Sequence, residues 1–211
     1  MPEIMSMIKY SFSILIVLFI FSCDISSDDL PIYGIPTISD SGDTTAYMIP
    51  EFSLVNQDSA LVNNGSLADF IYISDFFFMS CPSICPKVKK QMLRIYDKFE
   101  QNPQVKLVSH TIDPKRDTPA RLKIYAENLE VNTDKWFFLT GHKDTMMDLA
   151  HAYFVSAMED PEAPGGFDHS GKILLVDKNR HIRAFADGTE AKEVDAFLIK
   201  INQLLKEYET N

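Results

Sequence analysis

The stretch DFIYISDFFF, at residues 69–78, constrains the fold of this chain more than any other. Its residues are mostly β-branched or aromatic, and they are apolar on both faces for most of its length. A strand with one wet face alternates apolar and polar residues, whereas a strand covered on both faces is a nearly continuous apolar run. The stretch therefore predicts a central strand with other elements packed on both faces of its sheet.

The segments after this strand predict helices and strands in alternation. Apolar residues at Val88, Met92, Ile95 and Phe99 recur at spacings that place them on one face of a helix. In chain order, we expect a helix at 86–100, a strand at 105–112, a helix at 118–129, a strand at 135–141, a helix at 142–154, a strand–turn–strand hairpin at 172–188 and a helix at 190–208.

This order predicts an α/β protein with a thioredoxin-like fold. A short parallel βαβ unit joined to an antiparallel hairpin, with helices on both faces of the sheet, is typical of that class. Residues 52–67 alternate around polar turns and predict a further β-hairpin in front of the central strand. We therefore expect a central mixed sheet flanked by helices, with an N-terminal β-hairpin extension, in a domain spanning residues 47–208.

The N-terminal residues predict export from the cytoplasm. Residues 11–21, SFSILIVLFIF, form an apolar run of eleven residues, whereas a membrane-spanning helix needs about 20. The run is typical of a secretion signal, and the FSC that ends it resembles a lipobox. We expect residues 1–22 to be a lipoprotein signal peptide, Cys23 to carry lipid, and the polar residues 23–46 to form a flexible tether. An uncleaved, slightly short membrane anchor is the alternative, and both place the domain in the cell envelope.

The charge of the chain argues against nucleic acid as a partner. Its formal net charge is −10, and it contains no run rich in Lys and Arg. An acidic surface suits a cationic partner or a metal ion, although its general effect is to keep a protein soluble.

The other two of the three cysteines, Cys81 and Cys85, lie where the central strand runs into its helix. In α/β sheets, this carboxyl edge is where ligands collect. Pro82 and Pro86 each bias the preceding cysteine away from the helical conformation, and Pro86 suits the first turn of a helix. We therefore expect the pair on a loop that turns into the helix.

Three uses of this pair compete. A structural disulfide can form in an exported domain, but here it would close a very short loop, which constrains the unfolded chain least. A catalytic dithiol of the thioredoxin type has two residues between its cysteines, and this pair has three. A metal site would use two soft thiolates, which select Cu(I) or zinc. Because a structural zinc site needs four ligands, a metal site here requires a further ligand elsewhere.

Five histidines are candidates for that ligand. His110 lies inside a strand pattern, so we expect it to be packed in the core. His142 and His151, on the third predicted helix, and His181, just after a turn, are expected at the surface. His169 lies on a Gly- and Pro-rich loop ahead of a strand, and in a thioredoxin-like fold that loop lies beside the cysteine loop. We therefore favour His169 as a ligand over the simpler interpretation of a solvated loop residue.

The motifs FFFMSCPSICP, TIDPKRDTP and DHSGKILLVD, in this order, resemble the Sco/SenC family. The resemblance extends from Tyr47 to the C-terminus. Members of this family are membrane-anchored, thioredoxin-like copper-binding proteins that help to build the binuclear copper centre of cytochrome c oxidase subunit II. The resemblance implies that Cys81, Cys85 and His169 bind one copper ion, as Cu(I) or Cu(II), and that the cysteines can cycle to a disulfide. It also implies that Asp113, which matches an acidic position near the site, supports a ligand.

Two functions remain open at this point. The first is a copper metallochaperone, rather than an enzyme, that delivers copper to cytochrome c oxidase subunit II or another envelope copper protein, or reduces the cysteines of its copper site. The second is a general thiol–disulfide oxidoreductase of the envelope, for which His169 would be dispensable. A peroxiredoxin-like enzyme is disfavoured because FMSCPSIC lacks the threonine of a Thr-x-x-Cys arrangement.

Overall fold

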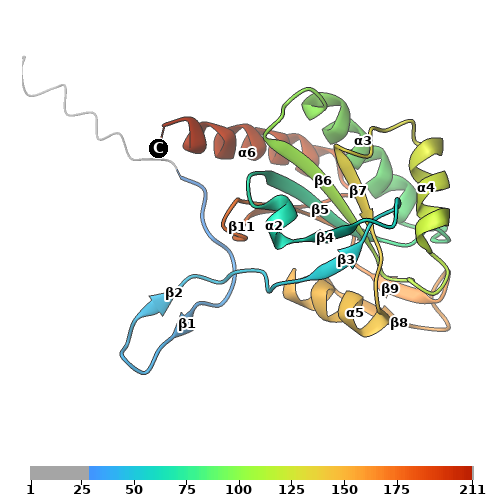
Figure 1. Cartoon of the computed structure of the whole chain (residues 1–211), viewed down its shortest axis with the longest axis horizontal. Coiled ribbons are helices and arrows are strands. Elements are labelled where there is room, and N and C mark those ends of the chain that lie inside the picture. Colours follow the sequence, from blue (N-terminus) through green and yellow to red (C-terminus); the bar gives the residue numbers. More distant parts are fainter. Residues whose placement is uncertain (1–28, 211) are drawn as a thin grey trace, which may run out of the picture.

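A five-stranded sheet of order β11–β10–β5–β6–β7 forms the centre of the protein, in a computed structural model that describes residues 29–210 (Figure 1). Its strands are β5 (Ile71–Phe77), β6 (Val105–Thr111), β7 (Trp136–Leu139), β10 (Lys172–Val176) and β11 (Ile182–Asp187). Strands β5, β6 and β7 are parallel, whereas β10 is antiparallel to both of its neighbours, β5 and β11. The sheet is therefore mixed, as predicted.

Helices cover both faces of this sheet. The longer helices are α3 (Cys85–Phe99), α4 (Pro119–Asn128), α5 (Lys143–Ala152) and α6 (Ala191–Thr210). Apolar residues of α3, α4 and α6 form one buried cluster with the sheet, and those of α5 form a second cluster on the other face. The hairpin of β3 (Ser53–Val55) and β4 (Leu61–Asn63), followed by the short α2 (Asn64–Leu67), contributes to the second cluster.

Strand β5 lies between these two clusters. All seven of its residues are buried. Ile73 and Phe77 belong to the cluster with α3, whereas Tyr72 and Phe76 belong to the cluster with α5, because successive side chains of a strand point to opposite faces. The predicted central strand is confirmed, and with it the α/β class with a mixed sheet flanked by helices and an additional β-hairpin.

One hairpin differs from the sequence-based expectation. The segment expected to be a loop ahead of β10 contains two short strands, β8 (Ala157–Glu159) and β9 (Phe167–His169), which pair antiparallel. Strands of three residues are too short for the period-two pattern by which a strand is recognised. The turn between them contains Gly165 and Gly166, both with a positive φ.

The described part of the predicted tether, residues 29–46, makes contacts with the domain. Leu30 is buried, and its N–H donates to Glu207 of α6 at 2.6 Å. Tyr33 forms a bridge with Ile182 of β11. The strands β1 (Thr37–Ile38) and β2 (Thr44–Thr45) form a small hairpin that extends away from the domain (Figure 1). The flexible tether expected from the polar composition thus has Leu30 and Tyr33 in contact with the domain.

The predicted signal peptide and Cys23 lie outside the described residues. Within residues 29–210, none of the helices combines the length and the apolar character needed to cross a bilayer.

Candidate metal centre

Cys81 and Cys85 lie at the carboxyl end of β5, where the chain turns into α3. The N–H of Cys81 donates to the carbonyl of Phe78 at 3.2 Å, which closes a tight turn after the strand. Cys85 is the first residue of α3, and Pro86 occupies the first turn of that helix. The N–H of Cys85 donates to the Cys81 Sγ at 3.5 Å. The predicted placement on a loop is confirmed for Cys81, whereas Cys85 is already the first residue of the helix.

His169, the last residue of β9, reaches this pair from a segment 84 residues further along the chain. Its Nε2 lies 3.3 Å from the Cys85 Sγ and 4.0 Å from the Cys81 Sγ. The three potential ligand atoms all lie within 4.8 Å of one another, and no other such group of metal-ligating side chains occurs in residues 29–210. Both cysteines are free thiols.

The contact of the His169 Nδ1 determines which of the two ring nitrogens carries the proton. Its Nδ1 lies 3.2 Å from the backbone carbonyl of Ser170, and a carbonyl can only accept, so Nδ1 carries the proton. In the neutral ring, Nε2 then presents its lone pair toward the two thiols. A ligating histidine is commonly oriented in this way by a hydrogen bond from its other nitrogen.

The other histidines lie apart from the thiols. His110 is fully buried, its Nδ1 lies 3.2 Å from the Ser74 hydroxyl, and burial lowers its pKa to about 3. This confirms the expected core position. His142 and His151 are exposed, as expected. His181 is mostly covered rather than exposed, because its Nδ1 packs 3.3 Å from the buried carboxylate of Asp177.

The environment shifts the pKa values of the two thiols in opposite directions. Burial alone would raise the pKa of Cys81, but hydrogen bonds from Cys85, together with the contact to His169, outweigh burial and lower this pKa to about 6. Burial raises the pKa of Cys85, and the hydrogen bond to Cys81 raises it further. At neutral pH, Cys81 is therefore a thiolate and Cys85 a protonated thiol.

Asp75, on β5, is a buried acid beside the site that sequence reasoning passed over. Burial raises its pKa to about 6, and the Ser109 hydroxyl donates to its carboxylate. The Trp136 indole N–H donates in turn to Ser109 at 2.8 Å. Asp75 and Cys85 line the same small cavity beneath α3. An acid in the middle of the apolar run 70–78 was the signal that could have identified it.

The acid that contacts the cysteine loop is Asp117, and not Asp113. The carboxylate of Asp113 pairs with the Arg116 guanidinium. The Asp117 carboxylate instead accepts hydrogen bonds from the Met79 N–H at 3.0 Å and from the Thr111 hydroxyl at 2.6 Å. The TIDPKRDTP motif pointed to the right loop, but its first aspartate is one helical turn away from the residue that contacts the cysteine loop.

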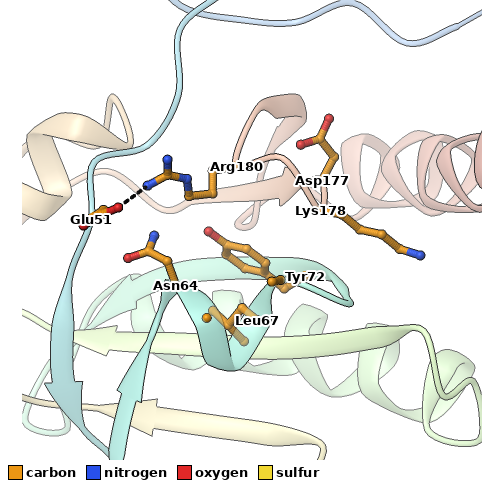
Figure 2. Close-up of a pocket in the computed structure, with 9 residues that line it drawn as sticks. Glu51, Asn64, Leu67, Tyr72, Asp177, Lys178 and Arg180 are labelled. Carbon is orange, nitrogen blue, oxygen red and sulfur yellow. Dashed lines mark ion pairs between the residues drawn. The ribbon is translucent and has the colours of Figure 1, made fainter.

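A second hollow, of about 190 Å³, lies near the amino end of β5 (Figure 2). Its lining includes Tyr72, Asn64 and Asp177, and it also contains an ion pair of 3.9 Å between Glu51 and Arg180. No thiol or imidazole lines it. Its donors are therefore unsuited to the soft metals that the Cys81 site favours.

Comparisons with known proteins support the assignment of the fold. A family model described as SCO1/SenC matches residues 40–206. The SCO1 protein homolog of Bacillus subtilis is 29% identical over 155 residues, which are 72% of this chain and 80% of that protein. The copper-bound structure of Arabidopsis thaliana ScoI is 26% identical with a TM-score of 0.63, over 75% of this chain and 99% of that one. The structure of BsSco, described as having a disulfide switch and as belonging to the Sco family of cytochrome c oxidase assembly proteins, is 27% identical with a TM-score of 0.66, over 75% of this chain and 93% of that one.

Proposed function

The chain belongs to the SCO1/SenC family, and we propose that it is a membrane-anchored copper-binding protein of the cell envelope that serves the binuclear copper site of cytochrome c oxidase. It delivers copper to that site or reduces the cysteines that will hold the copper. The observation that carries this proposal is the convergence of Cys81, Cys85 and His169, whose ligand atoms lie within 4.8 Å of one another.

The donor set fits copper better than zinc. Two thiolates and one imidazole are one ligand short of a closed structural zinc site, and no fourth Cys, His, Asp or Glu joins the group in the described part of the chain. Thiolates are soft donors that favour Cu(I), and an imidazole also suits Cu(II). Because Cys81 is already a thiolate at neutral pH, only Cys85 has to release a proton when the ion binds.

The opposite pKa shifts of the cysteines support the reductive form of the function. The Cys81 thiolate attacks one sulfur of a target disulfide, which forms a mixed disulfide and releases the other target sulfur as a thiolate. Cys85 gives its proton to the released target thiolate and attacks the Cys81 sulfur; the second target sulfur leaves as a thiolate, which takes a proton from water, and a Cys81–Cys85 disulfide forms. Two electrons pass to the target, so an external dithiol has to reduce the pair before the next cycle. A general oxidoreductase of the envelope would use the same steps without requiring His169.

Membrane attachment and the partner rest on separate observations. The apolar run at 11–21 followed by Cys23 supports a lipid anchor. The description of BsSco as one of the cytochrome c oxidase assembly proteins supports the oxidase as the partner.

The test is a titration of the reduced protein with Cu(I) and with Cu(II), without oxygen, against a chelator of known affinity. We expect one ion per chain. His169→Ala should lower Cu(II) affinity far more than Cu(I) affinity, because Cu(I) can remain bound to two thiolates. If His169→Ala matches the wild type for both oxidation states, His169 is not a ligand, and the general oxidoreductase becomes the better interpretation.

A further inference from the structure

The loop of residues 113–117, which follows β6 and precedes α4, contacts both of the segments that carry the candidate ligands. We propose that this loop holds the cysteine loop (residues 78–84) and the histidine hairpin (residues 157–169) in a fixed position relative to each other. It thereby sets the preference of the site between Cu(I) and Cu(II). The inference rests on the copper binding proposed above. It assigns positioning roles to two neighbouring residues, Arg116 and Asp117.

Asp117 holds the cysteine loop. Its side chain is fully buried, and one carboxylate oxygen accepts the Met79 N–H at 3.0 Å and the Thr111 hydroxyl at 2.6 Å. The other oxygen has no hydrogen-bond partner. A hydrogen bond from a backbone N–H to a carboxylate is stronger than one to a neutral acceptor. Asp117 therefore fixes the backbone two residues before Cys81.

Arg116 holds the histidine hairpin. Its Nη2 donates to the carbonyl of Gly165 in the hairpin turn at 3.0 Å. Its Nε pairs with the carboxylate of Asp113, and its guanidinium lies 6.0 Å from the centre of the Phe167 ring. The planar guanidinium is thus held by Asp113 while it binds the turn, and Phe167 is two residues before His169.

The two ligand-bearing segments also pack directly on each other. Gly165 has a φ of +85°, and a Cβ at this position would lie 2.7 Å from the ring of Phe78. The same ring contacts those of Phe167 and His169, with centres 5.2 and 5.5 Å away. Glycine allows the hairpin to lie this close to Phe78, and the 113–117 loop holds both segments beside that contact.

The distribution of the ligands predicts different roles for the two positioning residues. Both thiolates belong to the cysteine loop and the start of α3, and two thiolates suffice for Cu(I). Cu(II) prefers nitrogen and oxygen donors and therefore depends on His169. Displacing the hairpin should weaken Cu(II) binding selectively, whereas displacing the cysteine loop should weaken the binding of both ions.

The experiment compares Arg116→Ala with Arg94→Ala in competition titrations of both copper states. Arg94, on α3, is a partly exposed arginine that also pairs with an aspartate, Asp195, so its removal is matched in charge. We expect Arg116→Ala to lower Cu(II) affinity by about 10–100-fold, the usual cost of losing an outer partner of a metal ligand, and Cu(I) affinity much less. The thiolate-to-Cu(II) absorption should also shift, whereas Arg94→Ala should leave both affinities and the spectrum unchanged.

Variants at Asp117 provide the second part of the experiment. Asp117→Ala should lower both affinities and shift the reduction potential of the metal-free cysteine pair, whereas Asp117→Asn, which keeps an acceptor oxygen for Met79, should restore much of the loss. If Arg116→Ala does not fold, Arg116→Lys keeps the charge beside Asp113 but lacks the planar fork, and the same selective loss of Cu(II) is expected.

Two results would overturn the inference while leaving the proposed function intact. The first is that the wild type binds copper, while Arg116→Ala has the same Cu(I) and Cu(II) affinities as Arg94→Ala. The other is an equal loss of Cu(I) and Cu(II) in Arg116→Ala. Failure of the wild type to bind copper would overturn both proposals.

Discussion

The two ends of β5 differ in how completely their buried polar groups are partnered. At the amino end, Asp177 accepts hydrogen bonds from two backbone N–H groups, at 2.8 and 2.9 Å, and from Arg183 at 3.1 Å. Arg183 also binds Glu207 at 2.6 Å and the carbonyl of Leu30. Asp177, which lines the hollow in Figure 2, is therefore paired and held in place.

At the carboxyl end, buried groups keep free bonding capacity. Cys81 and Cys85 are unpaired thiols within reach of the His169 Nε2, and one oxygen of Asp117 has no partner. Buried polar groups are normally satisfied, so exceptions require an explanation, and shifted pKa values gather at functional sites. The comparison teaches that the amino end is built to hold the chain together, and the carboxyl end to take up a ligand.

The largest effect should follow from removing a thiol at the carboxyl end. We expect Cys85→Ser to abolish tight Cu(I) binding, because one thiolate and one imidazole no longer provide the soft pair that selects the ion. The measurement is a Cu(I) competition titration, with the thermal unfolding midpoint as the control for folding. Tight binding in Cys85→Ser would show that the two ends do not differ as described.

A variant at the amino end should have the opposite profile. Arg183→Ala leaves the carboxylates of Asp177 and Glu207 without their shared cation, and breaking a buried ion pair costs about 3–5 kcal/mol. The free energy of unfolding, measured in denaturant, should fall by this amount, while the copper affinity of the folded protein stays unchanged. A loss of copper affinity without a loss of stability would break the comparison.

A variant at Asp75 tests whether a buried group at the carboxyl end lowers the stability of the folded protein. Burial raises its pKa to about 6 from 3.8. As the pH rises from about 4 to 6, the unfolded chain ionises first, so the stability of the folded protein falls, and the loss is complete above about pH 6. Asp75→Asn should remove this decline and raise the free energy of unfolding at pH 7 by at most roughly 3 kcal/mol. Unfolding curves at pH 4 and pH 7 measure this, and an unchanged pH dependence would contradict it.

The smallest expected effect concerns the rate at which the reduced, metal-free pair is alkylated. Cys81 should react with a midpoint near pH 6, whereas Cys85 should stay unreactive in this range because its pKa is raised. In His169→Ala, the midpoint for Cys81 should move upward, since the contact with His169 that lowers the pKa of Cys81 is lost. Mass spectrometry of the alkylated peptides distinguishes the two cysteines, and equal reactivity at pH 7 would count against the predicted asymmetry.

The sequence alone predicted the features that depend on neighbouring residues. The apolar run at 69–78 identified the central strand, and the apolar spacing at 86–100 identified α3, where Val88, Met92, Ile95 and Phe99 are all buried. The prolines after each cysteine placed the pair where the loop turns into the helix, with Cys81 on the loop and Cys85 at the start of α3. These features follow from the periods of strands and helices and from the restricted backbone of proline, all of which act over a few residues. The location of His169 beside the thiols followed only once a fold had been inferred.

Only the tertiary structure decided how the site is held and how it ionises. Asp117 reaches Met79 across 38 residues, and Arg116 reaches Gly165 across 49. The pKa of Cys81 falls while that of Cys85 rises because burial and hydrogen bonds act on them unequally, although the two thiols are chemically identical in the sequence. Such contacts join segments that no local period connects, and desolvation depends on everything that packs around a group. The candidate ligands could therefore be named from the chain, whereas their positioning and protonation required the folded molecule.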